Sequence, residues 1–265
     1  MQLNLISLIQ KTQTCFTRQN DMKHLLIIFF LTLSFNCLGQ KESRELVEVT
    51  AQKVGIKNSA IFFQLAVSQE FENDILIVIP EIAEEGEGYM ILTSNIILTN
   101  KKSGTIKAKF RGEKEWFSDA VRIDQIEIEP SIYKLNETNV AFGLKVFYAN
   151  QSRPNPSSIT ELSLYAFDGE KLNVVLKEFP ISHYVGKTDT TCIGTFEVHT
   201  KELKISNTYT NQHADLEFVN SIELYEQNEN CEKIIKDAKK EVEILKYESG
   251  RYKKFEISPD GRNDQ

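Results

Sequence analysis

The sequence predicts an all-β or β-rich protein built from antiparallel sheets, arranged as a sandwich, a barrel or an irregular propeller. Short runs of apolar and β-branched residues recur along the chain, which is the pattern of strands. Glycine-containing turns such as Asp168-Gly169 and Ser249-Gly250 separate several of these runs. Helical spacing is almost absent. The best helix candidate is one short stretch near the C-terminus, residues 234–242.

The first predicted elements precede and surround a strongly apolar run. Residues 42–54 are charged and moderately helical in pattern, which predicts a lead-in or a short helix. The β-branched run 75–79 predicts a strand buried on both faces, which Pro80 ends because proline cannot continue a ladder. The neighbouring strands are expected over residues 60–67, 89–92, 95–99 and 105–110.

The second half of the chain continues the β pattern. Residues 121–129 alternate between apolar and polar, and the alternation slips once at Gln125, as it does at a β-bulge. Residues 252–257 complete a closing hairpin. The other strands are expected over residues 140–148, 159–167, 171–179, 195–199, 202–206, 216–225 and 243–247.

The N-terminus has the layout of a secretory signal peptide. Met22 and Lys23 precede an apolar run over residues 25–33, and the small residue Gly39 then allows cleavage before Gln40. The signal peptide is therefore predicted over residues 22–39. Residues 1–21 are interpreted as an upstream extension before the true start at Met22, or alternatively as part of a longer charged region.

Two other interpretations of the N-terminus remain open. Cys37 could be the acylated residue of a lipoprotein signal, although the preceding Phe35 and Asn36 are larger than such a signal prefers. A retained anchor helix would need about 20 apolar residues, more than this run provides. The remaining chain is divided into a single β-rich domain over residues 40–258 and a flexible tail over residues 259–265.

The charge balance and the cysteines agree with export. Without residues 1–39 the chain has 28 basic and 37 acidic side chains, a net charge of −9. An acidic balance disfavours nucleic acid as a partner. Cys192 and Cys231 form an even pair, which predicts a disulfide in an oxidising compartment. The alternative is two unpaired buried thiols.

Several segments resemble a broad set of exported bacterial β proteins, such as those of Bacteroidota. The resemblance rests on residues 75–80 and 95–110, on the later Asp215-Leu216 strand, and on a last hairpin over 245–252 with the pattern aromatic-x-x-Gly-x-aromatic. It implies a β-rich envelope protein. In those proteins a calcium-like acidic loop precedes the first buried strand. Here the corresponding residues 70–74 lack the glycine that such a loop needs, so no metal site is assigned.

No catalytic, metal or cofactor site is predicted. His183, His199 and His213 are widely separated and lack the spacing of metal ligands. The chain has no Gly-x-Ser-x-Gly nucleophile motif. Residues 81–87 carry four glutamates in a polar stretch, which is interpreted as a solvated charge run.

Two features are candidate binding residues. Trp116 and Phe117 lie among polar residues, where exposed aromatic side chains contact sugars or proteins. The alternative is that Trp116 packs in the core. Arg153 lies in the polar, proline-containing stretch 150–158, which is either a recognition loop or a solvated hairpin tip.

These observations predict an exported, non-enzymatic binding protein of the cell envelope, periplasmic or secreted. Its ligand is an unidentified protein or glycan, and it meets a membrane only if Cys37 is lipidated. One alternative is an inhibitor of a cell-wall muramidase, because an acidic protein suits a basic partner. Others are a glycoside hydrolase with paired carboxylates, and a structural envelope component.

Overall fold

The structure is a computed structural model, and it describes residues 43–255. The chain divides between Thr50 and Ala51 into two compact units. An α-helix over residues 43–54 opens the described chain, as the lead-in pattern suggested. The predicted upstream extension, the predicted signal peptide with its cleavage site between Gly39 and Gln40, and the predicted tail from residue 259 lie outside the described residues.

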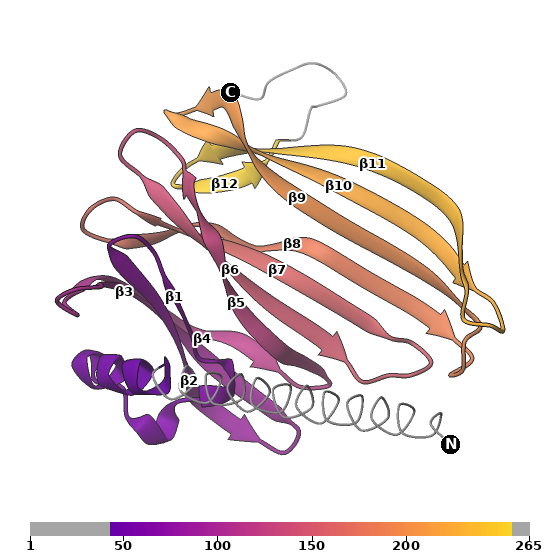
Figure 1. Ribbon diagram of the computed structural model, residues 1–265, viewed down its shortest axis with the longest axis horizontal. Helices are drawn as coiled ribbons and strands as arrows, with labels where there is room; N and C mark the ends of the chain where they lie inside the picture. Colours follow the sequence, from indigo (N-terminus) through magenta and orange to yellow (C-terminus); the bar gives the residue numbers. More distant parts are fainter. Residues whose placement is uncertain (1–42, 256–265) are drawn as a thin grey trace, which may run out of the picture. The chain divides into compact units, whose positions relative to one another are not determined.

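The second unit contains two antiparallel sheets (Figure 1). Two short 3-10 helices, η1 (Asn58–Ala60) and η2 (Phe63–Leu65), precede them. The first sheet has the order β1-β2-β3-β4. Its strands are β1 (Val67–Glu70), β2 (Asp74–Gly86), β3 (Tyr89–Asn100) and β4 (Ile106–Ser118).

The second sheet has eight strands in the order β12-β11-β10-β9-β8-β7-β6-β5. Its outermost strands, β5 and β12, do not pair with each other, so this sheet stays open within the described chain. The predicted β-rich antiparallel class is confirmed. The strands are β5 (Val121–Lys134), β6 (Val140–Asn150), β7 (Ser157–Phe167), β8 (Leu172–Thr188), β9 (Gly194–Thr210), β10 (His213–Gln227), β11 (Lys233–Glu248) and β12 (Arg251–Lys254).

The predicted helix over residues 234–242 is wrong. These residues belong to β11, which pairs antiparallel with β10. Every residue from 233 to 242 is exposed, so no buried face imposes a period on this part of the sequence. Its lysines and glutamates favour a helix locally, but pairing with β10 decides the conformation, as tertiary context does for strands.

Two details of strand register also test the sequence analysis. The slip at Gln125 is confirmed as a register shift between β5 and β6. Pro80 does not end its strand, because β2 continues to Gly86 and Pro80 lies opposite Ser94. β1 pairs with β2 only as far as Val78, so proline stands where β2 has no paired strand on that side.

The core consists of two clusters on opposite faces of strands β6 and β7. Phe142 and Leu144 of β6 pack with residues of the first sheet such as Leu92 and Ile96. The adjacent Ala141 belongs to the second cluster, together with Phe218 of β10 and Leu245 of β11. Successive strand residues point to opposite faces, so β6 and β7 are buried on both sides.

Candidate functional site

The candidate site begins at three consecutive polar residues in the middle of the apolar strand β3. Thr93, Ser94 and Asn95 are all buried. The sequence analysis placed a break between two strands here, but β3 runs through without interruption. Burying a polar side chain costs free energy unless the side chain forms hydrogen bonds, so each of these three residues needs a partner within the protein.

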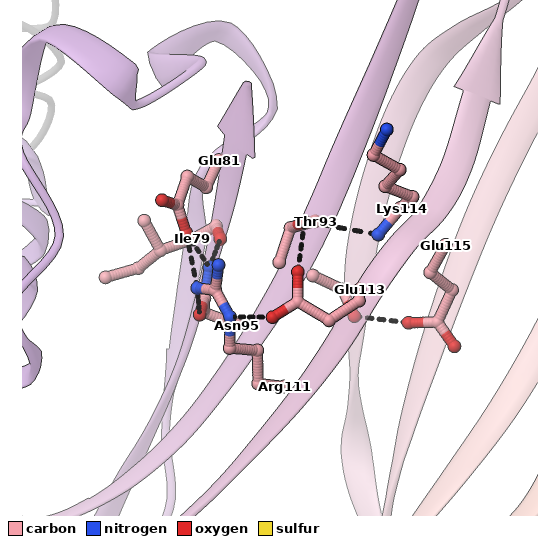
Figure 2. Close-up of polar contacts among 9 residues, drawn as sticks. Ile79, Glu81, Thr93, Asn95, Arg111, Glu113, Lys114 and Glu115 are labelled. Atoms are coloured by element: carbon pink, nitrogen blue, oxygen red, sulfur yellow. Dashed lines mark hydrogen bonds and ion pairs between the residues drawn. The ribbon is translucent and has the colours of Figure 1, made fainter. Parts of the chain in front are cut away.

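Asn95 fixes an arginine on the neighbouring strand (Figure 2). Its amide nitrogen donates to the carbonyl oxygen of Ile79 at 3.1 Å and to Glu81 at 3.3 Å. Its amide oxygen accepts from a guanidinium nitrogen of Arg111 at 2.8 Å, and the same nitrogen donates to Glu81. The position of the Arg111 side chain is therefore set by buried groups.

Thr93 supports a bulge in β4. Leu92 lies opposite Trp116 and Ser94 lies opposite Gly112, so the three residues 113–115 face Thr93 alone. The Thr93 hydroxyl accepts from the backbone nitrogen of Lys114 at 3.2 Å and donates to Glu113 at 3.4 Å. The bulge changes the direction in which the side chains of Glu113 and Glu115 point. Lys114, between them, has a φ of 49°.

The same bulge brings Glu113 to Arg111. The Arg111 Nε donates to a Glu113 carboxylate oxygen, and this hydrogen bond holds the pKa of Glu113 below its ordinary value. Glu113 is exposed, so it presents a fixed negative charge to solvent.

Ser94 holds the second glutamate of the bulge inside the protein. The side chain of Glu115 is only 5 % exposed, accepts a hydrogen bond from the Ser94 hydroxyl, and pairs with Lys177 Nζ at 3.2 Å. A Cβ atom at Gly112 would overlap the Glu115 carboxylate, so glycine leaves the space that this arrangement needs. Glu115 thus links β4 of the first sheet to β8 of the second.

A second bulge lies in the other sheet, at residues 177–178 of β8. Glu178 has a φ of 49°, and its backbone nitrogen donates to the Ser163 hydroxyl at 3.0 Å. Burial, together with the charge of Glu178, raises the pKa of Glu161 on β7 to about 7. Burial and the nearby charges of Glu161 and Glu178 also raise the pKa of the Tyr148 hydroxyl.

The raised pKa of Glu161 predicts an unusual dependence of stability on pH. Above its ordinary pKa of 4.5 and below about 7, the folded state holds a proton that the unfolded state has lost. The free energy of unfolding should therefore fall as pH rises through this window. Glu161→Gln should flatten the fall and exceed the wild type in stability at pH 8, while matching it near pH 4.

Urea denaturation at pH values from 4 to 8 measures this effect. Glu127→Gln on β5 is a matched control, because Glu127 is an exposed strand glutamate. Parallel pH curves for the wild type and Glu161→Gln would contradict the assignment.

A groove of about 610 Å³ runs along the bulge of β4. Glu113 and Glu115 line one side, Asn173 and Lys177 of β8 line another, and His213 and Tyr247 line a further part. The His213 and Tyr247 rings stack with centroids 3.7 Å apart. This volume is in the range of small-molecule sites, and the lining offers donors, acceptors, both signs of charge and an aromatic surface.

The candidate binding residues from the sequence do not form one site. The prediction that Trp116 is a binding residue is wrong, because its side chain is only 2 % exposed and packs in the core between the sheets. Phe117 is 50 % exposed and stacks on Tyr89, with ring centroids 6.2 Å apart. Arg153 is exposed in the β6–β7 loop, where its carbonyl oxygen accepts from the Thr188 hydroxyl at 3.0 Å.

The predicted cysteine pair is confirmed. Cys192 and Cys231 form a disulfide with their Cα atoms 4.8 Å apart and a sequence separation of 39. It joins the β8–β9 turn to the β10–β11 turn. Two separate thiols, the alternative, are excluded by this geometry.

Acidic and histidine side chains that were considered as metal ligands in the sequence contact other side chains in the structure. Glu70 pairs with Lys101, and Asp74 pairs with Lys107 at 2.7 Å. His199 lies 2.6 Å from Glu197. Among residues 43–255, no group of histidine, cysteine, aspartate and glutamate has the arrangement of a metal site. Over the same residues, no helix is long and apolar enough to cross a bilayer.

Comparisons with protein-family models, curated proteins and solved structures gave no match to this chain. Sequence reasoning missed the candidate site because Thr93-Ser94-Asn95 looks like a turn. The only signal in the sequence was that three polar residues lie between two apolar segments that both favour strands.

Proposed function

We propose that this protein is an exported, non-enzymatic binding protein of the cell envelope, and that its ligand is a glycan held in the groove along β4. The observation that carries the proposal is a groove in which the polar groups are already fixed. Glu113 lines the groove and is held by the buried Thr93 and by Arg111, which Asn95 positions, so little ordering is needed when a ligand binds. The disulfide supports an oxidising compartment.

The lining of the groove suits a sugar. Hydroxyl groups both donate and accept, and the groove offers Glu113 as acceptor, Lys177 as donor, and the Asn173 amide as both. The stacked His213 and Tyr247 rings supply an apolar surface beside these groups. Three consecutive buried polar residues in an otherwise apolar strand depart from the local pattern, and such departures occur at functional sites, which favours a functional role for the charges that Thr93, Ser94 and Asn95 hold.

Glycan binding is tested with the purified full chain, soluble peptidoglycan fragments and a panel of neutral oligosaccharides. Glu113→Gln removes a fixed charge from the groove and should weaken binding of the preferred glycan about tenfold, the usual effect of losing a charged hydrogen bond. Glu127→Gln, on the outer strand β5, should leave the affinity unchanged. Equal affinities for the wild type and Glu113→Gln would contradict the assignment of the groove.

A second candidate function is glycoside hydrolysis. Such enzymes need one carboxyl that keeps its proton near neutral pH and another that is ionised. The raised pKa of Glu161 and the Glu115–Lys177 ion pair fit these two requirements. Hydrolysis of a glycosidic substrate that is lost in Glu161→Gln would favour this function, and binding without turnover would favour the first.

A further inference from the structure

Among residues 43–255, the outer edge of β11 is unpaired over most of its length. β12 pairs with β11 only from Leu245 to Glu248, and Figure 1 shows β12 beside one end of the longer strand. Within the described chain, no strand pairs with the outer side of residues 233–243. An edge of eleven residues offers backbone donors and acceptors over about 36 Å, and such an edge is a template for a further strand.

One face of β11 and β12 next to this edge is both apolar and basic. Val242, Ile244 and Phe255 are exposed there, with Val242 at 58 %. Lys246 lies directly opposite Lys253 in the register of β11 and β12, and its Nζ lies 3.6 Å from the centre of the Phe255 ring. Alternation along β11 places Lys240 on the same face.

Three of these lysines lack a counter-charge. Lys233, Lys236 and Lys239 of β11 each pair with a glutamate. Among residues 43–255, neither Lys240, Lys246 nor Lys253 has an ion-pair partner. Like charges directly opposite each other destabilise a sheet, and here they occur in a chain whose net charge is −7. An anionic partner would remove that repulsion.

We propose that the open edge of β11 docks an extended acidic segment of a partner protein, which adds to the sheet as a further strand. The backbone of the segment pairs with residues 233–243. Its apolar side chains cover Val242 and Ile244, and its carboxylates neutralise Lys240, Lys246 and Lys253. This surface is separate from the groove along β4.

A second copy of β11 brings like charges together at this edge. Antiparallel pairing of two identical strands has a two-fold axis, and an axis at Asp237, Lys239 or Lys240 places that charge opposite its own copy. An axis at Ala238 pairs Asp237 with Lys239 but places Lys236 opposite Lys240, so none of these four axes avoids a like-charge pair. A lipid surface would meet the basic and apolar side chains but leave the backbone edge unpaired.

The test uses the full chain and a fluorescein-labelled peptide of eleven residues in which threonine fills every second position and valine and glutamate alternate at the others, so that valine and glutamate share one face of the strand. Fluorescence anisotropy should show saturable binding. The same peptide with lysine in place of glutamate should bind at least tenfold more weakly, and N-methylation of every second residue should abolish binding. Lys246→Glu with Lys253→Glu should weaken binding at least tenfold. The matched double variant Lys57→Glu with Lys102→Glu should bind as the wild type does.

The N-methylated peptide tests backbone pairing on the unaltered protein, so the proposal does not depend on how the variants fold. Equal binding of the acidic and basic peptides, or retained binding after N-methylation, would overturn the proposal. Binding only to vesicles that contain phosphatidylglycerol would overturn it in favour of a membrane surface. Glu113→Gln should leave peptide binding intact, which separates this result from failure of the groove.

Discussion

Trp116→Ala should lower the free energy of unfolding by about 3–5 kcal/mol, the usual loss for a large buried aromatic side chain. Trp116 packs in the core between the two sheets with Leu92 and Leu144. Its removal leaves a cavity where β4 meets the second sheet. Urea denaturation followed by circular dichroism at one pH measures the loss.

The adjacent residue provides a matched control. Phe117→Ala should cost less than about 1 kcal/mol, because Phe117 is half exposed and contacts Tyr89 at the surface. The two substitutions remove aromatic side chains from neighbouring positions of one strand. Similar losses for both variants would mean that Trp116 does not lie in the core, and the sequence-based alternative of an exposed aromatic pair would return.

Replacing Cys192 and Cys231 by serine should lower the free energy of unfolding by about 3–4 kcal/mol. The disulfide closes a loop with a sequence separation of 39 residues, and the cross-link reduces the conformational freedom of the unfolded chain by about this amount. Comparing the urea midpoints of the double variant and the wild type, each with and without reductant, measures the effect.

The urea midpoint of the double variant should be the same with and without reductant. The double variant therefore controls for effects of the reductant other than cleavage of the disulfide. Binding of a glycan in the groove should persist in it under conditions where it is folded, since the disulfide joins turns at the ends of β8–β11 rather than the bulge of β4. Equal midpoints for the wild type with and without reductant would contradict a stabilising role for the bond.

Strands were predicted correctly where burial or a register shift in the folded protein imposes a local pattern on the sequence. The apolar run 75–79 lies in the buried part of β2, and residues 140–148 lie in β6, which is buried on both faces. The slip at Gln125 marks a register shift, because one extra residue reverses the alternation. Each of these signals depends on residues close together in sequence.

The site could not be predicted in this way. Thr93, Ser94 and Asn95 have partners 14 to 21 residues away, and the Glu115–Lys177 pair joins two different sheets. Residues 234–242 were predicted wrongly, as a helix, for a different reason. Their strand conformation is imposed by β10 while all their side chains remain exposed, so their sequence carries no period for a strand.

Patterns along the chain were enough to predict the β-rich class, the acidic balance and a disulfide between Cys192 and Cys231. Alternation, net charge and an even number of cysteines can all be counted along the chain. The tertiary structure alone decided that Trp116 belongs to the core, that β3 holds Arg111 and Glu113 in place, and that the edge of β11 stays open in the described chain. These properties depend on which strands become neighbours, and that is settled by burial and pairing between segments far apart in sequence.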